Sequence, residues 1–260
     1  MKPLILITND DGVNSKGITE LIKLAQPFGE VLVVAPNSAR SAQSSALTVT
    51  HPLLFDEILN QNELRIISCT GTPADCVKLA CSLQIPNVER EPDLILSGIN
   101  HGSNASINVI YSGTIGGAIE GALYHKNSIG FSLCNHAPDA DFTHTLPYFS
   151  KIIQEVIKKD LPKGICLNVN APVEQIKGMK ICRQAKGTWK NEFLAVPTPY
   201  GKDCYWLAGD FINDEPEADD TDEWALKNGY ISIQPVQVDM TDHNAVKILK
   251  TQLEITNLNL

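Results

Sequence analysis

Features that would place this 260-residue chain in a membrane or on nucleic acid are missing from its sequence. No apolar run approaches the ~20 residues that a membrane-spanning helix needs. The four apolar residues near the amino terminus are too few for the apolar region of a secretory signal peptide. Basic residues are scarce, with 21 Lys and Arg against 30 Asp and Glu. We therefore expect no membrane contact and no nucleic-acid polymer as a partner, because both need an excess of basic charge.

Cysteine pairs with metal-site or redox spacing are also missing. The seven cysteines include no Cys-x-x-Cys, and most lie in apolar stretches, as Cys166 does. Free thiols buried in a reducing compartment are favoured over disulfides or a zinc site by this pattern. We expect a cytoplasmic protein.

Buried-strand and helix patterns alternate along most of the chain. β-branched-rich apolar runs predict strands, and apolar residues at helical spacing predict the helices between them. The strands are expected at residues 4–8, 31–35, 64–68, 93–97, 129–133 and 165–169, and the helices at 18–25, 72–83, 114–124 and 146–157. This order predicts an α/β fold with a doubly wound, mostly parallel, Rossmann-like sheet.

The pattern changes after about residue 186. Short strand-like pieces are expected at 204–207 and 230–238, with an amphipathic segment at 244–253. We therefore divide the chain into a core, residues 1–185, and an appended C-terminal α+β region, residues 186–260. Eight acids between 210 and 223 are more typical of a solvated loop than of a site. The tryptophans of this region, at 189, 206 and 224, are expected in packing or oligomer contacts rather than in base stacking.

Polar loops follow three of the predicted strands. In an open parallel sheet, such loops meet at the carboxyl edge, where ligands bind. The first loop carries Asp10 and Asp11 before Gly12, and the other two, residues 36–45 and 97–104, are rich in hydroxyl and amide groups. Alternatively, one aspartate caps the following helix and the loops are ordinary polar connections. Taken together, the loops offer an all-oxygen ligand set that suits Mg²⁺ or Mn²⁺.

A fourth polar segment, residues 111–118, begins a predicted helix with hydroxyls and glycines. Free N–H groups and the positive end of the helix dipole make such a position an anion site. A capped, tightly packed small-residue helix would have the same composition. A cation opposite a phosphate site is typical of phosphoester hydrolysis, because the cation polarises the phosphoryl oxygen and activates water.

These segments carry a resemblance to a known family. ITNDDGVNSKGI, VVAPNSARSAQSSALT, GTPADCV, PDLILSGINHGSN, IYSGTIGGAIEGAL, GYISIQP and DMTDH resemble, in this order, the SurE family of 5′/3′-nucleotidases. The resemblance implies a hydrolase that uses one divalent cation per subunit, Mg²⁺ or Mn²⁺, on nucleoside monophosphates, with activity on 3′-nucleotides and short polyphosphate. It implies a homodimer or homotetramer that exchanges elements of the C-terminal region.

The same resemblance implies a set of site residues. Its metal ligands would be Asp10, Asp11, Ser41 and Asn100, with the two aspartates also catalytic. The phosphate would lie among Asn104, Ser112, Gly113 and Thr114, with His243 as a neighbour.

Other classes of protein remain open at this point. A phosphorelay receiver also places two acids after its first strand, but it needs an aspartate after its third strand and is about half as long. A nucleotide-binding protein without turnover would keep the same residues. No G-x-x-x-x-G-K-[ST] motif is present, which disfavours Walker-type NTPases. For the enzyme, both water and Asp10 are candidate nucleophiles.

Overall fold

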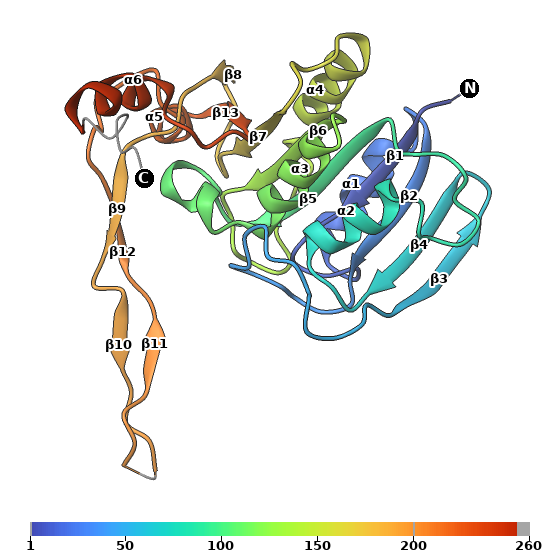
Figure 1. Cartoon of the computed structure of the whole chain (residues 1–260), viewed down its shortest axis with the longest axis horizontal. Helices are drawn as coiled ribbons and strands as arrows, with labels where there is room; N and C mark the ends of the chain where they lie inside the picture. The colour runs from blue at the N-terminus through green and yellow to red at the C-terminus, as the bar shows by residue number, and fades with distance from the viewer. Residues whose placement is uncertain (1, 200, 254–260) are drawn as a thin grey trace, which may run out of the picture.

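The computed structural model describes residues 2–199 and 201–253 (Figure 1). Its main sheet has nine strands in the order β3-β4-β2-β1-β5-β6-β7-β13-β8. The six strands from β4 to β7 are parallel, whereas β3 is antiparallel to β4 and β13 to β7. The strands of this sheet are β1 (Leu4–Thr8), β2 (Glu30–Pro36), β3 (Phe55–Gln61), β4 (Leu64–Cys69), β5 (Leu94–His101), β6 (Asn127–Leu133), β7 (Ile165–Ala171), β8 (Gly178–Ile181) and β13 (Tyr230–Gln237).

Helices cover both faces of this sheet. On one face, α1 (Lys16–Ala25) and α4 (Leu146–Lys158) pack into one hydrophobic core with the strands, and on the other face α2 (Pro73–Cys81) lies against α3 (Gly113–Leu123). The predicted doubly wound α/β fold is therefore confirmed, and its strands and helices lie close to their expected positions. None of the described helices has the length and apolar character to cross a bilayer.

Local sequence signals determine where the helices begin. The Ser15 hydroxyl accepts the N–H of Ile18, and Thr72 forms a capping box with Asp75 in front of Pro73. Ser112 caps α3 by accepting the N–H of Ile115. These side chains satisfy N–H groups that have no partner inside the helix.

The sheet differs from expectation at three strands. β8, a strand of four residues paired with β13, was not predicted from the sequence. β5 continues past Ser97 to His101, because it keeps pairing with β6 after a register shift between Ser97 and Asn100. β3 was not predicted from the sequence. It is an edge strand, exposed at almost every position, so it lacks the alternating apolar pattern that marks a half-buried strand.

The C-terminal region forms a projecting arm and a return to the main sheet. The arm consists of β9 (Gly187–Lys190) paired with β12 (Asp210–Asn213) and, further out, β10 (Phe193–Ala195) paired with β11 (Tyr205–Leu207) (Figure 1). After α5 (Asp222–Lys227), β13 enters the main sheet between β7 and β8, and α6 (His243–Gln252) follows. The expected segments 204–207, 230–238 and 244–253 correspond to β11, β13 and α6. The division at residue 185 stays a prediction, and residues 254–260 of its second part lie outside the described residues.

The acidic segment is not the solvated loop that its composition suggests. Residues 210–213 form β12, and Glu215 pairs with Arg183. Asp222 is fully buried at the start of α5, where its carboxylate accepts N–H groups from Ser106, Ala185 and Glu223. Three backbone donors compensate the burial of this charge, so the expectation was wrong at both ends of the segment.

Candidate active site

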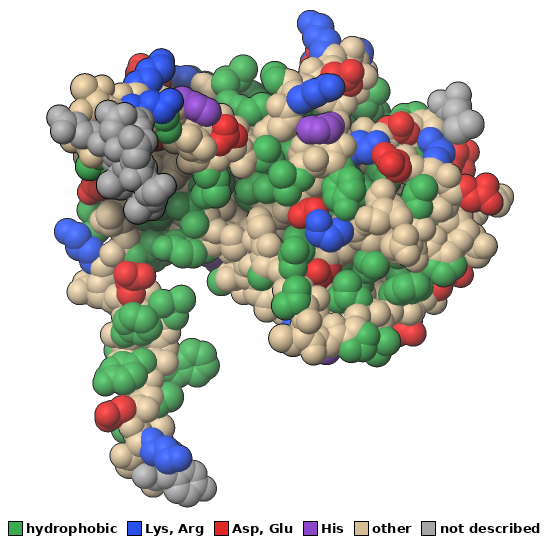
Figure 2. Space-filling view, viewed as in Figure 1, with side chains coloured by type: hydrophobic (Ala, Val, Ile, Leu, Met, Phe, Trp, Pro, Cys, Tyr) green, Lys and Arg blue, Asp and Glu red, His purple; other side chains and the backbone are tan. Residues whose placement is uncertain are grey.

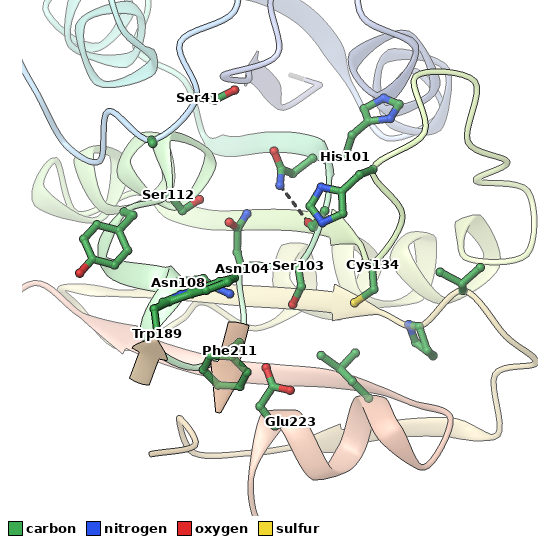
Figure 3. Close-up of a pocket in the computed structure, with 18 of the residues that line it drawn as sticks. Ser41, His101, Ser103, Asn104, Asn108, Ser112, Cys134, Trp189, Phe211 and Glu223 are labelled. Carbon is green, nitrogen blue, oxygen red and sulfur yellow. Dashed lines mark hydrogen bonds between the residues drawn. The ribbon is translucent and has the colours of Figure 1, made fainter. Parts of the chain in front are cut away.

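A cavity of about 940 Å³ opens at the carboxyl ends of β1 and β5. The strand order reverses between these strands, since the chain proceeds outward from β1 through β2 to β4 and returns to β5 on the other side. A doubly wound sheet binds its ligands at this reversal. Figure 3 shows Ser41 on one side of the cavity in this view, with Trp189, Phe211 and Glu223 on the other.

Asp10 and Asp11 line the cavity, just after β1. Asp10 is only 4% exposed, and its carboxylate accepts a hydrogen bond from the Thr114 hydroxyl. Burial is the main cause that raises the pKa of Asp10 to about 6, and the charge of Asp11 adds to it. Burial also raises the pKa of Asp11, whose Oδ2 accepts the backbone N–H of His101 at 3.2 Å. Two adjacent carboxylates with raised pKa values favour a bound cation, because a cation would compensate both charges.

The start of α3 lies directly against Asp10. A Cβ atom on Gly113 would approach the Asp10 Cβ to 2.8 Å and its Oδ2 to 2.9 Å, so this position has no room for a side chain. Ser112 lines the cavity, and Thr114 is fully buried against Asp10. A phosphate bound at the amino terminus of α3 would therefore lie beside the two carboxylates.

The third and fourth expected ligands reach the cavity from separate loops. Ser41 is exposed on the loop after β2, and Asn100 lies near the end of β5. The Asn100 Nδ2 donates to the Gly102 carbonyl at 2.9 Å, which leaves its Oδ1 as the acceptor for a ligand. Asp10, Asp11, Ser41 and Asn100 all line this one cavity.

This donor set fits a hard divalent cation. Two carboxylates, a hydroxyl and an amide oxygen are ligands that Mg²⁺ and Mn²⁺ accept, with water completing the shell. Among residues 2–199 and 201–253, no cluster of three or more His, Cys, Asp or Glu could hold a metal ion. The proposed set is consistent with this finding, because half of its ligands are serine and asparagine.

Asn104 is held by a buried network of amides that the sequence analysis missed. Its backbone N–H donates to the Asn170 Oδ1 at 2.8 Å, and its Nδ2 donates to the Ser132 hydroxyl at 2.9 Å. Asn170 donates to Asn168, which donates in turn to the Asn104 carbonyl and to Gln234. The signal was the sequence LNVN, which places two amides on one face of a buried strand where they need partners.

His243 lies apart from the other expected site residues. It begins α6 with an exposed side chain that hydrogen-bonds Asp239 at 2.9 Å, and it does not line the cavity. Its expected place beside the phosphate stays a prediction. His101 and His136 do line the cavity, from β5 and from the loop after β6.

Aromatic side chains from the arm form the far wall of the cavity. Trp189 on β9 and Phe211 on β12 meet edge to face, with ring centres 5.8 Å apart. The Trp189 Nε1 donates to the Asn108 Oδ1 at 2.9 Å, which fixes the indole to the 3₁₀ turn Ser106–Ile110. Trp206, in contrast, is 67% exposed on β11. The sequence alone did not place Trp189 at the site, because its position depends on the pairing of β9 with β12.

The fold and the cavity together define the class: a doubly wound α/β protein whose paired carboxylates face a helix amino terminus at the reversal of strand order. A family model described as "Survival protein SurE" matches residues 5–191. A protein named 5′-nucleotidase SurE from Bacteroides thetaiotaomicron is 51% identical over 246 residues, covering 94% of each chain. A protein of the same name from Phocaeicola vulgatus is 49% identical over 250 residues, covering 96% of each chain.

A solved structure agrees with these sequence matches. The crystal structure of the SurE protein from Aquifex aeolicus superposes with a TM-score of 0.81 at 36% sequence identity, covering 96% of this chain and 100% of that one. The chain belongs to the SurE family.

Proposed function

We propose that this chain is a 5′-nucleotidase that hydrolyses nucleoside 5′-monophosphates to nucleoside and phosphate. The observation that carries the proposal is the convergence of Asp10, Asp11, Ser41 and Asn100 on one cavity, with the start of α3 packed against Asp10. The relatives that span nearly the whole chain are named 5′-nucleotidases, which supports this choice of substrate.

We propose Asp10, Asp11, Ser41 and Asn100 as the ligands of one Mg²⁺ or Mn²⁺ ion. When bound, the ion would polarise a phosphoryl oxygen and lower the pKa of a bound water. Ser112, the N–H groups of Gly113 and Thr114, and Asn104 would hold the phosphate by donating hydrogen bonds to its oxygens. Thr114 orients the Asp10 carboxylate through its hydroxyl.

Water, rather than Asp10, is the nucleophile in this proposal. Thr114 donates to one oxygen of the Asp10 carboxylate, and Gly113 packs closely against the other. The carboxylate therefore has little freedom to approach phosphorus, whereas it can orient a water molecule or accept its proton. An acid-stable phosphoprotein trapped during turnover of ³²P-labelled AMP would contradict this assignment.

Metal removal tests the proposed activity. Protein treated with EDTA should stop releasing phosphate from AMP and should regain activity when Mn²⁺ or Mg²⁺ is added in excess. Asp10→Asn and Asp11→Asn should each lower kcat/KM by about 10²-fold or more. Asp56→Asn, on the exposed edge strand β3, is the matched control and should leave kcat/KM unchanged. Equal rates with and without metal, or full activity in both site variants, would refute the proposal.

The same proposal extends to substrates and assembly. A panel with 3′-AMP and short polyphosphate should also yield phosphate if the activity is as broad as expected. The arm presents exposed apolar side chains, Phe193, Leu194, Tyr205, Trp206 and Leu207, which support self-association as a dimer or tetramer (Figure 2). Light scattering should then give a mass of two or four chains. All seven cysteines are free, which supports a reducing compartment such as the cytoplasm.

A further inference from the structure

We propose that the far wall of the cavity is a nucleobase subsite in which the Trp189 indole stacks on the base. This inference rests on the proposed function, since it assigns the nucleoside half of the substrate to the half of the cavity that the metal and phosphate residues leave unused. The subsite consists of Trp189 and Phe211, with Asn108, Asn213 and Glu223 around them.

Trp189 lies where the nucleoside part of a substrate would extend from the candidate phosphate site. The Ser112 backbone N–H donates to the Asn108 carbonyl at 3.1 Å, and the Asn108 side chain accepts the indole N–H at 2.9 Å. One residue therefore links the amino terminus of α3 to the aromatic wall. A phosphomonoester whose phosphate lies at Ser112 would direct its remaining atoms along the cavity, and Figure 3 shows Trp189 and Phe211 on the wall beyond Asn108.

The indole is held in place before any ligand binds. Its hydrogen bond to Asn108 fixes one edge, and the Phe211 ring packs against it at 61°. Phe211 is itself confined by Gly187, because a Cβ atom there would approach the Phe211 ring to 2.5 Å. A fixed aromatic ring loses little conformational entropy on binding, so its stacking energy is retained as affinity.

The surroundings of the wall favour a heterocycle over an alkyl chain. Asn108, Asn213 and Glu223 line the same cavity as the two rings with amide and carboxyl groups, and Asn108 contacts the Trp189 indole directly. A flat base with polar edges can stack on the indole while its edge groups meet polar partners, whereas an alkyl chain would leave those partners unsatisfied. Every base has a π-face and can stack on the indole. We therefore expect the site to discriminate weakly among bases and to prefer purines.

Two variants at position 189 separate stacking from packing. Trp189→Phe and Trp189→Leu both lose the hydrogen bond to Asn108, but only phenylalanine keeps an aromatic face. AMP is compared with ribose 5-phosphate, which has the same phosphoester and no base. For Trp189→Leu we expect the KM for AMP to rise about 5- to 150-fold, which is the range for loss of one base–aromatic stack, with ribose 5-phosphate kinetics unchanged.

The phenylalanine variant should stay closer to the wild-type protein with AMP. Phe55→Leu, at an exposed aromatic residue on β3 outside the cavity, is the control and should leave the kinetics with both substrates unchanged. An equal rise in KM for both substrates in Trp189→Leu would mean that Trp189 only packs where the arm joins the core and does not contact the nucleobase. Equal kcat/KM for AMP and ribose 5-phosphate in the wild-type protein would also overturn the inference, while the proposed hydrolase activity would stand.

Adenosine binding gives a readout that does not depend on turnover. Calorimetric titration should show adenosine binding to the wild-type protein and to Trp189→Phe, with a weaker affinity for Trp189→Leu. If neither AMP nor ribose 5-phosphate is hydrolysed, the proposed function fails, and this titration still decides the subsite. Absence of adenosine binding to the wild-type protein would refute the subsite.

Discussion

Replacing Asn170 by alanine removes two buried hydrogen bonds that support the candidate phosphate site. Asn170 lies on β7, where its Oδ1 accepts the Asn104 N–H at 2.8 Å and its Nδ2 donates to the Asn168 Oδ1 at 2.9 Å. Asn168 and Asn170 are both 0% exposed. The substitution therefore leaves one donor and one acceptor without their partners in the interior of the protein.

The size of the effect follows from these two groups. A buried polar group without a partner costs about 1–3 kcal/mol, so Asn170→Ala should lower the free energy of unfolding by about 2–4 kcal/mol if water replaces part of the lost bonding. Because Asn104 loses the acceptor that positions its backbone, kcat/KM for AMP should also fall by about 10-fold or more. Urea unfolding and phosphate release measure the two effects separately.

Asn127→Ala is a matched control. Asn127 also makes two side-chain hydrogen bonds, to Asp160 and Leu161, but it lies at the start of β6, away from the cavity. Asn127→Ala should lower the free energy of unfolding without lowering kcat/KM for AMP. If Asn170→Ala costs no more stability and no more activity than Asn127→Ala, the network does not position Asn104.

Asn170→Asp adds a pH-dependent test of the same reasoning. A protonated aspartic acid can accept from Asn104 and donate to Asn168, whereas a carboxylate can only accept. Burial raises the pKa of such a group, so the folded state favours the proton. The stability of this variant relative to wild type should therefore be highest at low pH and should fall as pH rises through the folded-state pKa. A difference from wild type that does not vary with pH would refute the argument.

Two further substitutions test the contacts around the site. Gly113→Ala forces a methyl group against the buried Asp10 carboxylate, so it should cost about 1–3 kcal/mol of stability and weaken Mn²⁺ binding in a calorimetric titration; unchanged Mn²⁺ affinity would contradict this contact. Glu223→Gln tests a raised pKa: burial, with a contribution from Asp222, raises the pKa of Glu223 to about 7. The folded state binds the Glu223 proton more tightly than the unfolded state does. The protonated side chain therefore adds to the free energy of unfolding when the pH is below the ordinary pKa near 4.5, and this contribution is lost as the pH rises to about 7. The free energy of unfolding of metal-free protein, obtained from urea titrations at pH 5 and pH 8, should change less with pH in Glu223→Gln than in wild type, by on the order of 1 kcal/mol after solvent screening. An identical pH dependence in the two proteins would argue against the raised pKa.

The sequence was sufficient to predict the sheet and the convergence of the expected metal ligands on one cavity, because both depend on local patterns and one topological rule. Buried parallel strands appear as continuous apolar runs, and their carboxyl ends must share one edge. Asp10, Ser41 and Asn100 each follow or end such a strand, so their convergence did not require knowledge of side-chain packing.

The strands that were missed lack this kind of local signal. β3 is exposed on both faces. β8, β9, β10 and β12 have three or four residues each, so no apolar period can develop within them. The existence of these short strands depends on pairing, with β13 for β8 and across the arm for the others, as between Trp189 and Phe211. Sequence reasoning from separate segments has no access to such pairings, which is why Trp189 was expected only in packing or oligomer contacts.

Asp222 shows how the two parts of the chain act on one site. Its buried carboxylate accepts the N–H of Ser106, at the start of the 3₁₀ turn that carries Asn108, and the N–H of Ala185, just before β9. The turn that leads into α3 and the strand that carries Trp189 are therefore tied to a single anion. Because α3 begins at the candidate phosphate site, this arrangement couples the phosphate end of the cavity to its aromatic wall. The acids of segment 210–223, which the composition assigns to solvent, thus include a buried group that binds both segments leading to the cavity.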